Sequence, residues 1–221
     1  MLSQFPAGGD GAAAAPVAAL VRAVRVFPVK GMDAAAARTV RLDERGVVGD
    51  RRHAVLDDVG TLLTADREPR LREVSAWLDT DGAPRLDIPG AVHGLTLEAA
   101  GAALSDYLGS WVQVVAVDPA RTLDAPVHIV SVQSLEAAER GEHEVADCAC
   151  SLEEPRSNFV VDVQQHTDGS LAREERWIGR RMRIGDAVVE VQRRPGHCLG
   201  VYAVVVTPGE VQAGDPAVLL P

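Results

Sequence analysis

The sequence predicts a mostly β protein with a few helices, and three observations support this fold class. Short runs rich in valine recur every 8–12 residues. Turn residues, mainly Gly, Pro and Asp, separate these runs. Only two segments, 99–108 and 134–140, place apolar residues at helical spacing. Many short strands at this spacing are typical of a barrel or a sandwich.

The first half of the chain has the more uniform strand pattern. Residues 1–16 are rich in Ala and Gly and carry Asp10 but no basic residue, so we expect a flexible tail and not a signal peptide. Runs of apolar and β-branched residues bounded by turn residues follow. The strands predicted from these runs are residues 21–29, 39–42, 52–56, 61–64, 75–78, 85–88 and 95–97.

The second half mixes strands with helices. Residues 99–108 predict a helix, and residues 134–140 predict another, with Ser134 as its N-cap. The strands predicted here are residues 112–117, 126–132, 158–163, 187–191 and 202–206. This change in pattern predicts a tail over residues 1–20, a small β-barrel domain over 21–98 and a second β domain over 99–221.

Charge restricts the class of partner. The net charge of −10 argues against nucleic acid or an anionic membrane as the main partner. A local basic pocket for a small anion is still compatible with an acidic chain. Lysine occurs once, at Lys30, among many arginines, and arginine does not replace lysine as a compact point charge.

The three cysteines are Cys148, Cys150 and Cys198. An odd number, with two of them one residue apart, does not describe a disulfide framework. No Cys-x-x-Cys pair occurs and no histidine stands at zinc spacing, so we expect no structural zinc site. No apolar run reaches the ~18 residues that span a membrane. We therefore expect a reducing, cytoplasmic setting.

Residues 192–202 form the stretch with the most chemistry. Two valine-rich runs flank a loop that holds Pro195, Gly196, His197, Cys198 and Gly200. A loop held by rigid strands is a frequent place for site residues. The preceding histidine and two arginines favour the thiolate form of the cysteine. The structural alternative is a small apolar side chain in a glycine-dependent turn.

An ordered set of motifs resembles the MOSC superfamily, the C-terminal domain of molybdenum-cofactor sulfurase, with the small β-barrel that often precedes it. The match runs in collinear order over roughly residues 22–220. The motifs of the front half are residues 28–31, 46–51 and 64–71. Those of the back half are residues 128–131, 156–158, 175–179, 184–186, 198, 200–203 and 214–215.

The resemblance implies a β-barrel MOSC core, a small N-terminal β-barrel domain and a molybdenum–pterin cofactor. It implies that Cys198 ligates the metal. The residues that it places around the pterin and its phosphate are Lys30, Gly31, Arg51, Ser131, Arg156 and Asn158. Related proteins such as the amidoxime-reducing component suggest reduction of N-oxygenated substrates or sulfur transfer. A small-molecule substrate and a separate electron-transfer or sulfur-donor protein would then be the partners.

The types of these residues suit an anionic cofactor on independent grounds. Arg51 and Arg156 offer fork-shaped donors for a phosphate, and Lys30 offers a point charge. Each has a structural alternative. Arg51 can pair with its neighbour Asp50, and Arg156 can be one solvated arginine among many. The amide of Asn158 can cap a strand edge, and Ser131 can be an ordinary hydroxyl at a strand end.

Two departures from the family pattern keep other functions open. His197 stands where the family commonly has arginine, and Tyr202 follows Cys198 without the usual intervening excursion. One alternative is cofactor-free sulfur chemistry, as a persulfide carrier or carbon–sulfur lyase, with Cys198 as nucleophile and His197 as acid or base. Another is a non-catalytic carrier of cofactor or sulfur. No G-x-G-x-x-G fingerprint indicates a nucleotide domain.

Overall fold

The structure is a computed structural model that describes residues 18–118, 125–142, 156–163, 174–196 and 198–220. Strands dominate this part of the chain, and its α-helices are α1 (Leu97–Leu108) and α2 (Val132–Glu139). Short 3-10 helices, η1 (Pro69–Glu73) and η2 (Glu174–Trp177), complete its helical segments. The predicted mostly β fold class is confirmed.

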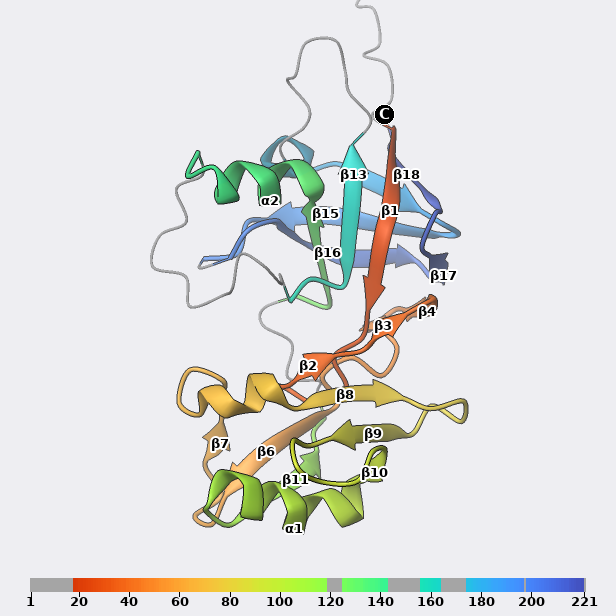
Figure 1. Cartoon of the computed structure of the whole chain (residues 1–221). Helices are drawn as coiled ribbons and strands as arrows, with labels where there is room; N and C mark the ends of the chain where they lie inside the picture. The colour runs from red at the N-terminus through yellow and green to blue at the C-terminus, as the bar shows by residue number, and fades with distance from the viewer. Residues whose placement is uncertain (1–17, 119–124, 143–155, 164–173, 197, 221) are drawn as a thin grey trace, which may run out of the picture.

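Seven strands close into a barrel (Figure 1). They are β1 (Ala18–Arg25), β12 (Val127–Ser131), β13 (Phe159–Val163), β14 (Arg181–Ile184), β15 (Ala187–Arg193), β16 (Val201–Thr207) and β18 (Pro216–Leu219). Their order is β13-β12-β16-β15-β14-β18-β1, and β1 pairs again with β13. The β12–β13 pair is parallel and the other pairs are antiparallel. Closure satisfies both edges of every strand in the ring.

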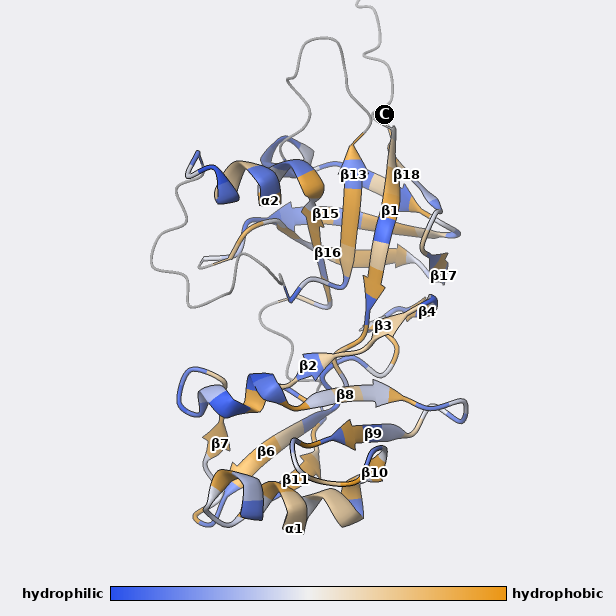
Figure 2. Cartoon of the chain, viewed as in Figure 1, coloured by the Kyte–Doolittle hydropathy of each residue, from blue (hydrophilic) through white to orange (hydrophobic). Residues whose placement is uncertain are grey.

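Buried side chains, many of them valine, form one apolar core inside the barrel. Buried apolar side chains line the barrel interior, and Figure 2 shows the hydrophobic colouring along β13 and β16. On β15, Ala187, Val189 and Val191 are fully buried, while Val188 and Glu190 between them are only half-buried. This alternation gives one apolar face per strand, the pattern of a closed sheet packed on its own interior.

A second group of elements lies beneath the barrel in Figure 1. One sheet holds β2 (Asp33–Ala34), β8 (Ser75–Leu78), β9 (Pro84–Asp87) and β10 (Leu95–Thr96), and another holds β6 (His53–Asp57), β7 (Leu62–Leu63) and β11 (Val112–Ala116). Helix α1 begins at the N-cap Thr96, ends at Gly109 in the left-handed conformation, and buries Ala100, Leu104 and Leu108 against these sheets. The group has its own apolar core.

Four further short strands complete the described strands. The sheet β17-β4-β5 pairs β4 (Thr39–Asp43) with β5 (Gly46–Val47) and with β17 (Gly209–Gln212). Strand β3 (Ala36–Ala37) pairs with β1 at the edge of the barrel sheet. The sequence predicted β4, but it predicted no strand over residues 207–216 and so missed β17.

Two boundary predictions need correction. Strand β1 begins at Ala18, so the last three residues of the predicted tail lie in a strand, while residues 1–17 are outside the described part of the chain. The N-cap of α2 is Ser131 and not Ser134, because the Ser131 hydroxyl accepts the Ser134 N–H at 3.0 Å. The division at residues 98 and 99 stays a prediction. The apolar core of the second group contains residues of α1 and β11 together with residues of the strands that precede them. The barrel core contains residues of β1 together with residues of the strands that follow.

Candidate functional site

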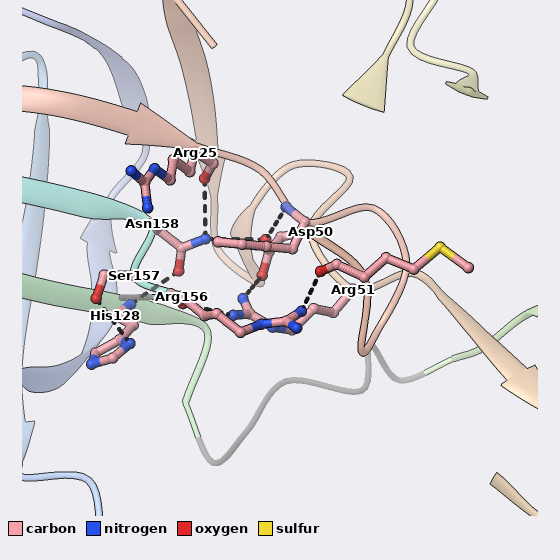
Figure 3. Close-up of polar contacts among 9 residues, drawn as sticks. Arg25, Asp50, Arg51, His128, Arg156, Ser157 and Asn158 are labelled. Carbon is pink, nitrogen blue, oxygen red and sulfur yellow. Dashed lines mark hydrogen bonds and ion pairs between the residues drawn. The ribbon is translucent and has the colours of Figure 1, made fainter. Parts of the chain in front are cut away.

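A buried carboxylate, Asp50, organises the residues that connect the two groups (Figure 3). Its side chain is 2% exposed. One oxygen accepts the Phe27 N–H at 2.8 Å and the Asn158 amide at 3.1 Å, and the other pairs with the guanidinium of Arg51. Burying a carboxylate destabilises the fold unless the group is paired and hydrogen-bonded, so these three contacts offset the free-energy cost of burying Asp50.

Two guanidinium groups lie against the ring of Phe27. The Arg51 Cζ is 4.7 Å from the ring centroid, and the Arg156 Cζ is 5.2 Å from it. Arg156 donates to the carbonyls of Gly31 at 2.8 Å and Met32 at 2.6 Å. Arg51 donates to the Arg156 carbonyl at 3.0 Å. The segment before β13 is thereby attached to the loop that carries Lys30.

The backbone of Arg51 is held in an uncommon conformation. Its φ is +49°, the one positive value among the described residues other than glycine. A left-handed arginine has a conformational cost of order 1–3 kcal/mol. The Arg51 N–H donates to the Phe27 carbonyl at 2.6 Å, and the guanidinium is fixed as described above. The surrounding bonds therefore fix the direction of this side chain.

A pocket of about 190 Å³ opens beside these arginines. Its lining residues are Lys30, Gly31, Arg51, Thr64, Ala65, Asp66, Arg72 and Arg156. We call this the anion pocket, because four of these side chains are cationic and one is acidic. The acidic one, Asp66, lies 3.1 Å from the Arg72 guanidinium. Four residues predicted around the cofactor, Lys30, Gly31, Arg51 and Arg156, therefore meet at one pocket.

Ser131 and Asn158, also predicted there, are not among its lining residues. Both are buried and have structural bonds. Ser131 caps α2, and its N–H donates to the buried carboxylate of Glu174, whose pKa burial raises. Asn158 accepts the His128 N–H at 3.1 Å and donates to Asp50 and to the Arg25 carbonyl. Their roles at a cofactor stay predictions.

Cys198 lies in the loop between β15 and β16 and is half-buried. It is not among the residues that line the anion pocket. His197, predicted as its acid–base partner, lies outside the described residues, as do Cys148 and Cys150. Within the described part of the chain, no three His, Cys, Asp or Glu side chains gather as a metal site.

The sequence placed His128 in the motif of residues 128–131 but gave it no role at the site. In the structure His128 lies between Asn158 and the turn that follows Cys198. Its Nε2 is 2.8 Å from the Leu199 carbonyl, and its Nδ1 is 3.3 Å from the Ser157 hydroxyl. Burial lowers the His128 pKa to about 4, so the ring is neutral near pH 7. A lone histidine in an otherwise apolar strand was the available signal. Its partners are distant in the sequence, so the signal did not reveal a role.

We expect His128 to make folding stability depend on pH. Its folded pKa of about 4 is below the unfolded value near 6.5, so its contribution is complete above pH 6.5 and is lost as pH falls toward 4. The shift corresponds to about 3 kcal/mol. Urea unfolding of the wild type and of His128→Gln from pH 7 to 4 should show a smaller loss for the variant. Glu174 titrates in both proteins and cancels in the difference, and parallel curves would contradict the assignment.

Comparison with known families identifies the first part of the chain. Residues 18–113 match the model described as the MOSC N-terminal beta barrel domain. This part of the chain is therefore similar to a MOSC N-terminal β-barrel domain. For these residues the family resemblance predicted from the sequence is confirmed, and the match includes α1 and the first two residues of β11. The MOSC N-terminal domain thus supplies Lys30, Gly31 and Arg51 to the anion pocket, while Arg156 comes from the segment before β13.

Similar solved structures include the YUAD protein from Bacillus subtilis, 13% identical, covering 92% of this chain and 96% of that one at a TM-score of 0.44. YiiM from Escherichia coli is 14% identical, with 91% and 70% covered at a TM-score of 0.38. TM-scores below 0.5 establish no shared fold, so the family assignment rests on the family-model match. The curated proteins include no match. No helix in the described ranges is long and apolar enough to cross a membrane.

Proposed function

We propose that this MOSC protein binds a molybdenum–pterin cofactor, with the anionic phosphate end in the anion pocket and the metal on the thiolate of Cys198. The supporting observation is that Lys30, Gly31, Arg51 and Arg156, which the family motifs selected from the sequence, line one cationic pocket. They come from three separate segments, Lys30 and Gly31, Arg51, and Arg156, so their meeting is a property of the fold and not of the motifs.

The residues of the pocket fit a phosphate group. Guanidinium and ammonium groups bind phosphate by charge-assisted hydrogen bonds, and the pocket concentrates them on a chain whose net charge is −10. Its volume of about 190 Å³ is below the ~300–1,000 Å³ that pockets for whole ligands occupy. It therefore suits the phosphate end, with the rest of the cofactor extending outside it.

Each side chain would have a distinct task. Arg51 and Arg156 are fixed by backbone carbonyls and Phe27, so they present guanidinium planes that need little reorganisation. Lys30 supplies a compact charge. Cys198 would hold the metal as a thiolate, and His197 would give or take a proton. When bound, the cofactor would supply two-electron redox chemistry or carry sulfur.

The proposed reaction is reduction of an N-oxygenated small molecule or sulfur transfer, which makes the protein an oxidoreductase or a sulfurtransferase. Electrons or sulfur would come from a separate protein, in a cytoplasmic setting. Cofactor-free sulfur chemistry at Cys198 is the alternative. It is favoured by the two departures from the family pattern, which are His197 in place of arginine and the direct passage from Cys198 to Tyr202.

Metal and pterin content test the proposal directly. We expect near-stoichiometric molybdenum and oxidised-pterin fluorescence in protein purified from a host that makes the cofactor. Lys30→Ala should lower pterin retention about tenfold or more, because a charge-assisted bond is worth about 1.5–3 kcal/mol. Lys30→Arg, which keeps the charge but not its compact shape, is the matched control and should retain more pterin than Lys30→Ala.

Two results would overturn the proposal. One is wild-type protein without molybdenum or pterin, and reactive Cys198 in that protein would then support cofactor-free sulfur chemistry. The other is cofactor that is retained equally by Lys30→Ala and Lys30→Arg, which would place the phosphate elsewhere. Bound cofactor without turnover of any N-oxygenated or sulfur-donor substrate would instead indicate a carrier.

A further inference from the structure

The turn that follows Cys198 packs directly on strand β12. Leu199 is 7% exposed and lies in an apolar cluster with Val130 and Val160. Gly200 has a φ of +91°, and a Cβ placed on it would be 2.3 Å from the Ile129 carbonyl oxygen. A side chain at this position is excluded by both conformation and space. The path of the chain after Cys198 is therefore set by β12.

His128 is the β12 side chain that bonds to this turn. Its Nε2 is 2.8 Å from the Leu199 carbonyl, which can only accept, so Nε2 carries the hydrogen. The Ser157 hydroxyl then donates to Nδ1, at 3.3 Å. The Tyr202 ring meets the imidazole edge-on, with 5.0 Å between the centroids and 63° between the planes. These contacts fix the tautomer and orientation of the ring.

The same histidine is connected to the anion pocket. Its backbone N–H donates to the Asn158 side-chain oxygen at 3.1 Å, and the Asn158 amide donates to Asp50 at 3.1 Å. Asp50 pairs with Arg51, which lines the pocket (Figure 3). A continuous set of buried hydrogen bonds therefore leads from the anion pocket to the residue after Cys198.

We propose that His128 is a positioning residue for Cys198, holding the Cys198 turn through the Leu199 carbonyl at a fixed place relative to the anion pocket. This inference rests on the proposed role of Cys198. His128 acts through the backbone and takes no part in bond making. Its contribution is preorganisation, because a thiolate that must ligate a metal works best when its loop is already in place.

The test compares variants at one position with a neighbouring control. His128→Leu removes the donor to the Leu199 carbonyl, and His128→Gln keeps a side-chain N–H of similar reach. Val127→Ala weakens the same strand by truncating a fully buried side chain and leaves the donor intact. The measurement is the rate of Cys198 alkylation by iodoacetamide in cofactor-free protein, followed on the Cys198 peptide by mass spectrometry.

We expect His128→Leu to raise the alkylation rate tenfold or more, because the half-buried thiol becomes mobile. His128→Gln and Val127→Ala should stay within threefold of the wild type. A rate within threefold for His128→Leu would overturn the proposal. An equal rise in Val127→Ala would overturn it as well, because general destabilisation would then explain the effect.

A second measurement does not depend on whether His128→Leu folds. Nitrogen-15 shifts of the wild-type imidazole should show the tautomer with hydrogen on Nε2. Hydrogen on Nδ1 alone would overturn the proposal, since Nε2 could not then donate to the Leu199 carbonyl. Molybdenum content is measured separately. Its absence from wild-type protein with the expected alkylation rates would refute the cofactor proposal and leave the positioning role standing.

Discussion

Replacing Cys198 with serine is expected to lower the molybdenum content of the purified protein by at least tenfold and to abolish turnover. The thiolate is the proposed protein ligand, and a serine hydroxyl, which stays protonated near neutral pH, is a poor substitute for it. The fold should be unaffected, because Cys198 lies half-buried in a loop. Molybdenum is measured by mass spectrometry, and pterin by its fluorescence after oxidation.

Cys148→Ser and Cys150→Ser are the matched controls, because each removes one thiol and neither was assigned to the metal. Both should keep wild-type molybdenum and activity. If Cys198→Ser retained wild-type molybdenum, the ligand assignment would be wrong. If it also retained full activity, the cofactor proposal and the cofactor-free alternative would both fail.

Replacing Asp50 with alanine is expected to destabilise the protein by about 3–5 kcal/mol, because the guanidinium of Arg51 is left buried without its counter-charge. The Phe27 N–H and one Asn158 N–H lose their acceptor as well. Equilibrium unfolding in urea measures the loss. Anion binding should weaken in parallel, because Asp50 fixes the direction in which Arg51 faces the pocket.

The matched control is Arg22→Ala, which removes an ion pair at the surface. The Arg22 side chain is 62% exposed and lies 2.6 Å from Asp162. Exposed pairs contribute at most about 1 kcal/mol, so this variant should change stability little. Comparable losses in Asp50→Ala and Arg22→Ala would show that the buried network does not hold the two groups of strands together.

The local pattern of apolar and turn residues was sufficient to predict most of the strands and both α-helices. Strands β4 and β8 occur where turn-bounded apolar runs predicted them, because one buried face per strand leaves a visible period. Strand β17 was missed because it begins at a glycine and buries one residue, Val211. Its strand character comes from pairing with β4, which is far away in the sequence.

The sequence predicted some residues of the candidate site and missed others. Lys30, Gly31, Arg51 and Arg156 meet at one pocket, as family motifs had suggested. Ser131 and Asn158 have structural hydrogen bonds that no local pattern could show, because their partners are set by tertiary packing. His128 was missed for the same reason, since the Leu199 carbonyl is 71 residues away in the chain.

The pairing of β1 has a consequence for biosynthesis. Strand β1 is made before the rest of the barrel, yet its partners in the ring are β13 and β18. Val24 and Arg25 can pair early with β3, but the ring partners of β1 are synthesised only after the second group of strands. Long-range closure of this kind slows folding and exposes strand edges to aggregation. We therefore expect nascent chains that end before β13 to depend on chaperones, and chains that include β18 to be released from them.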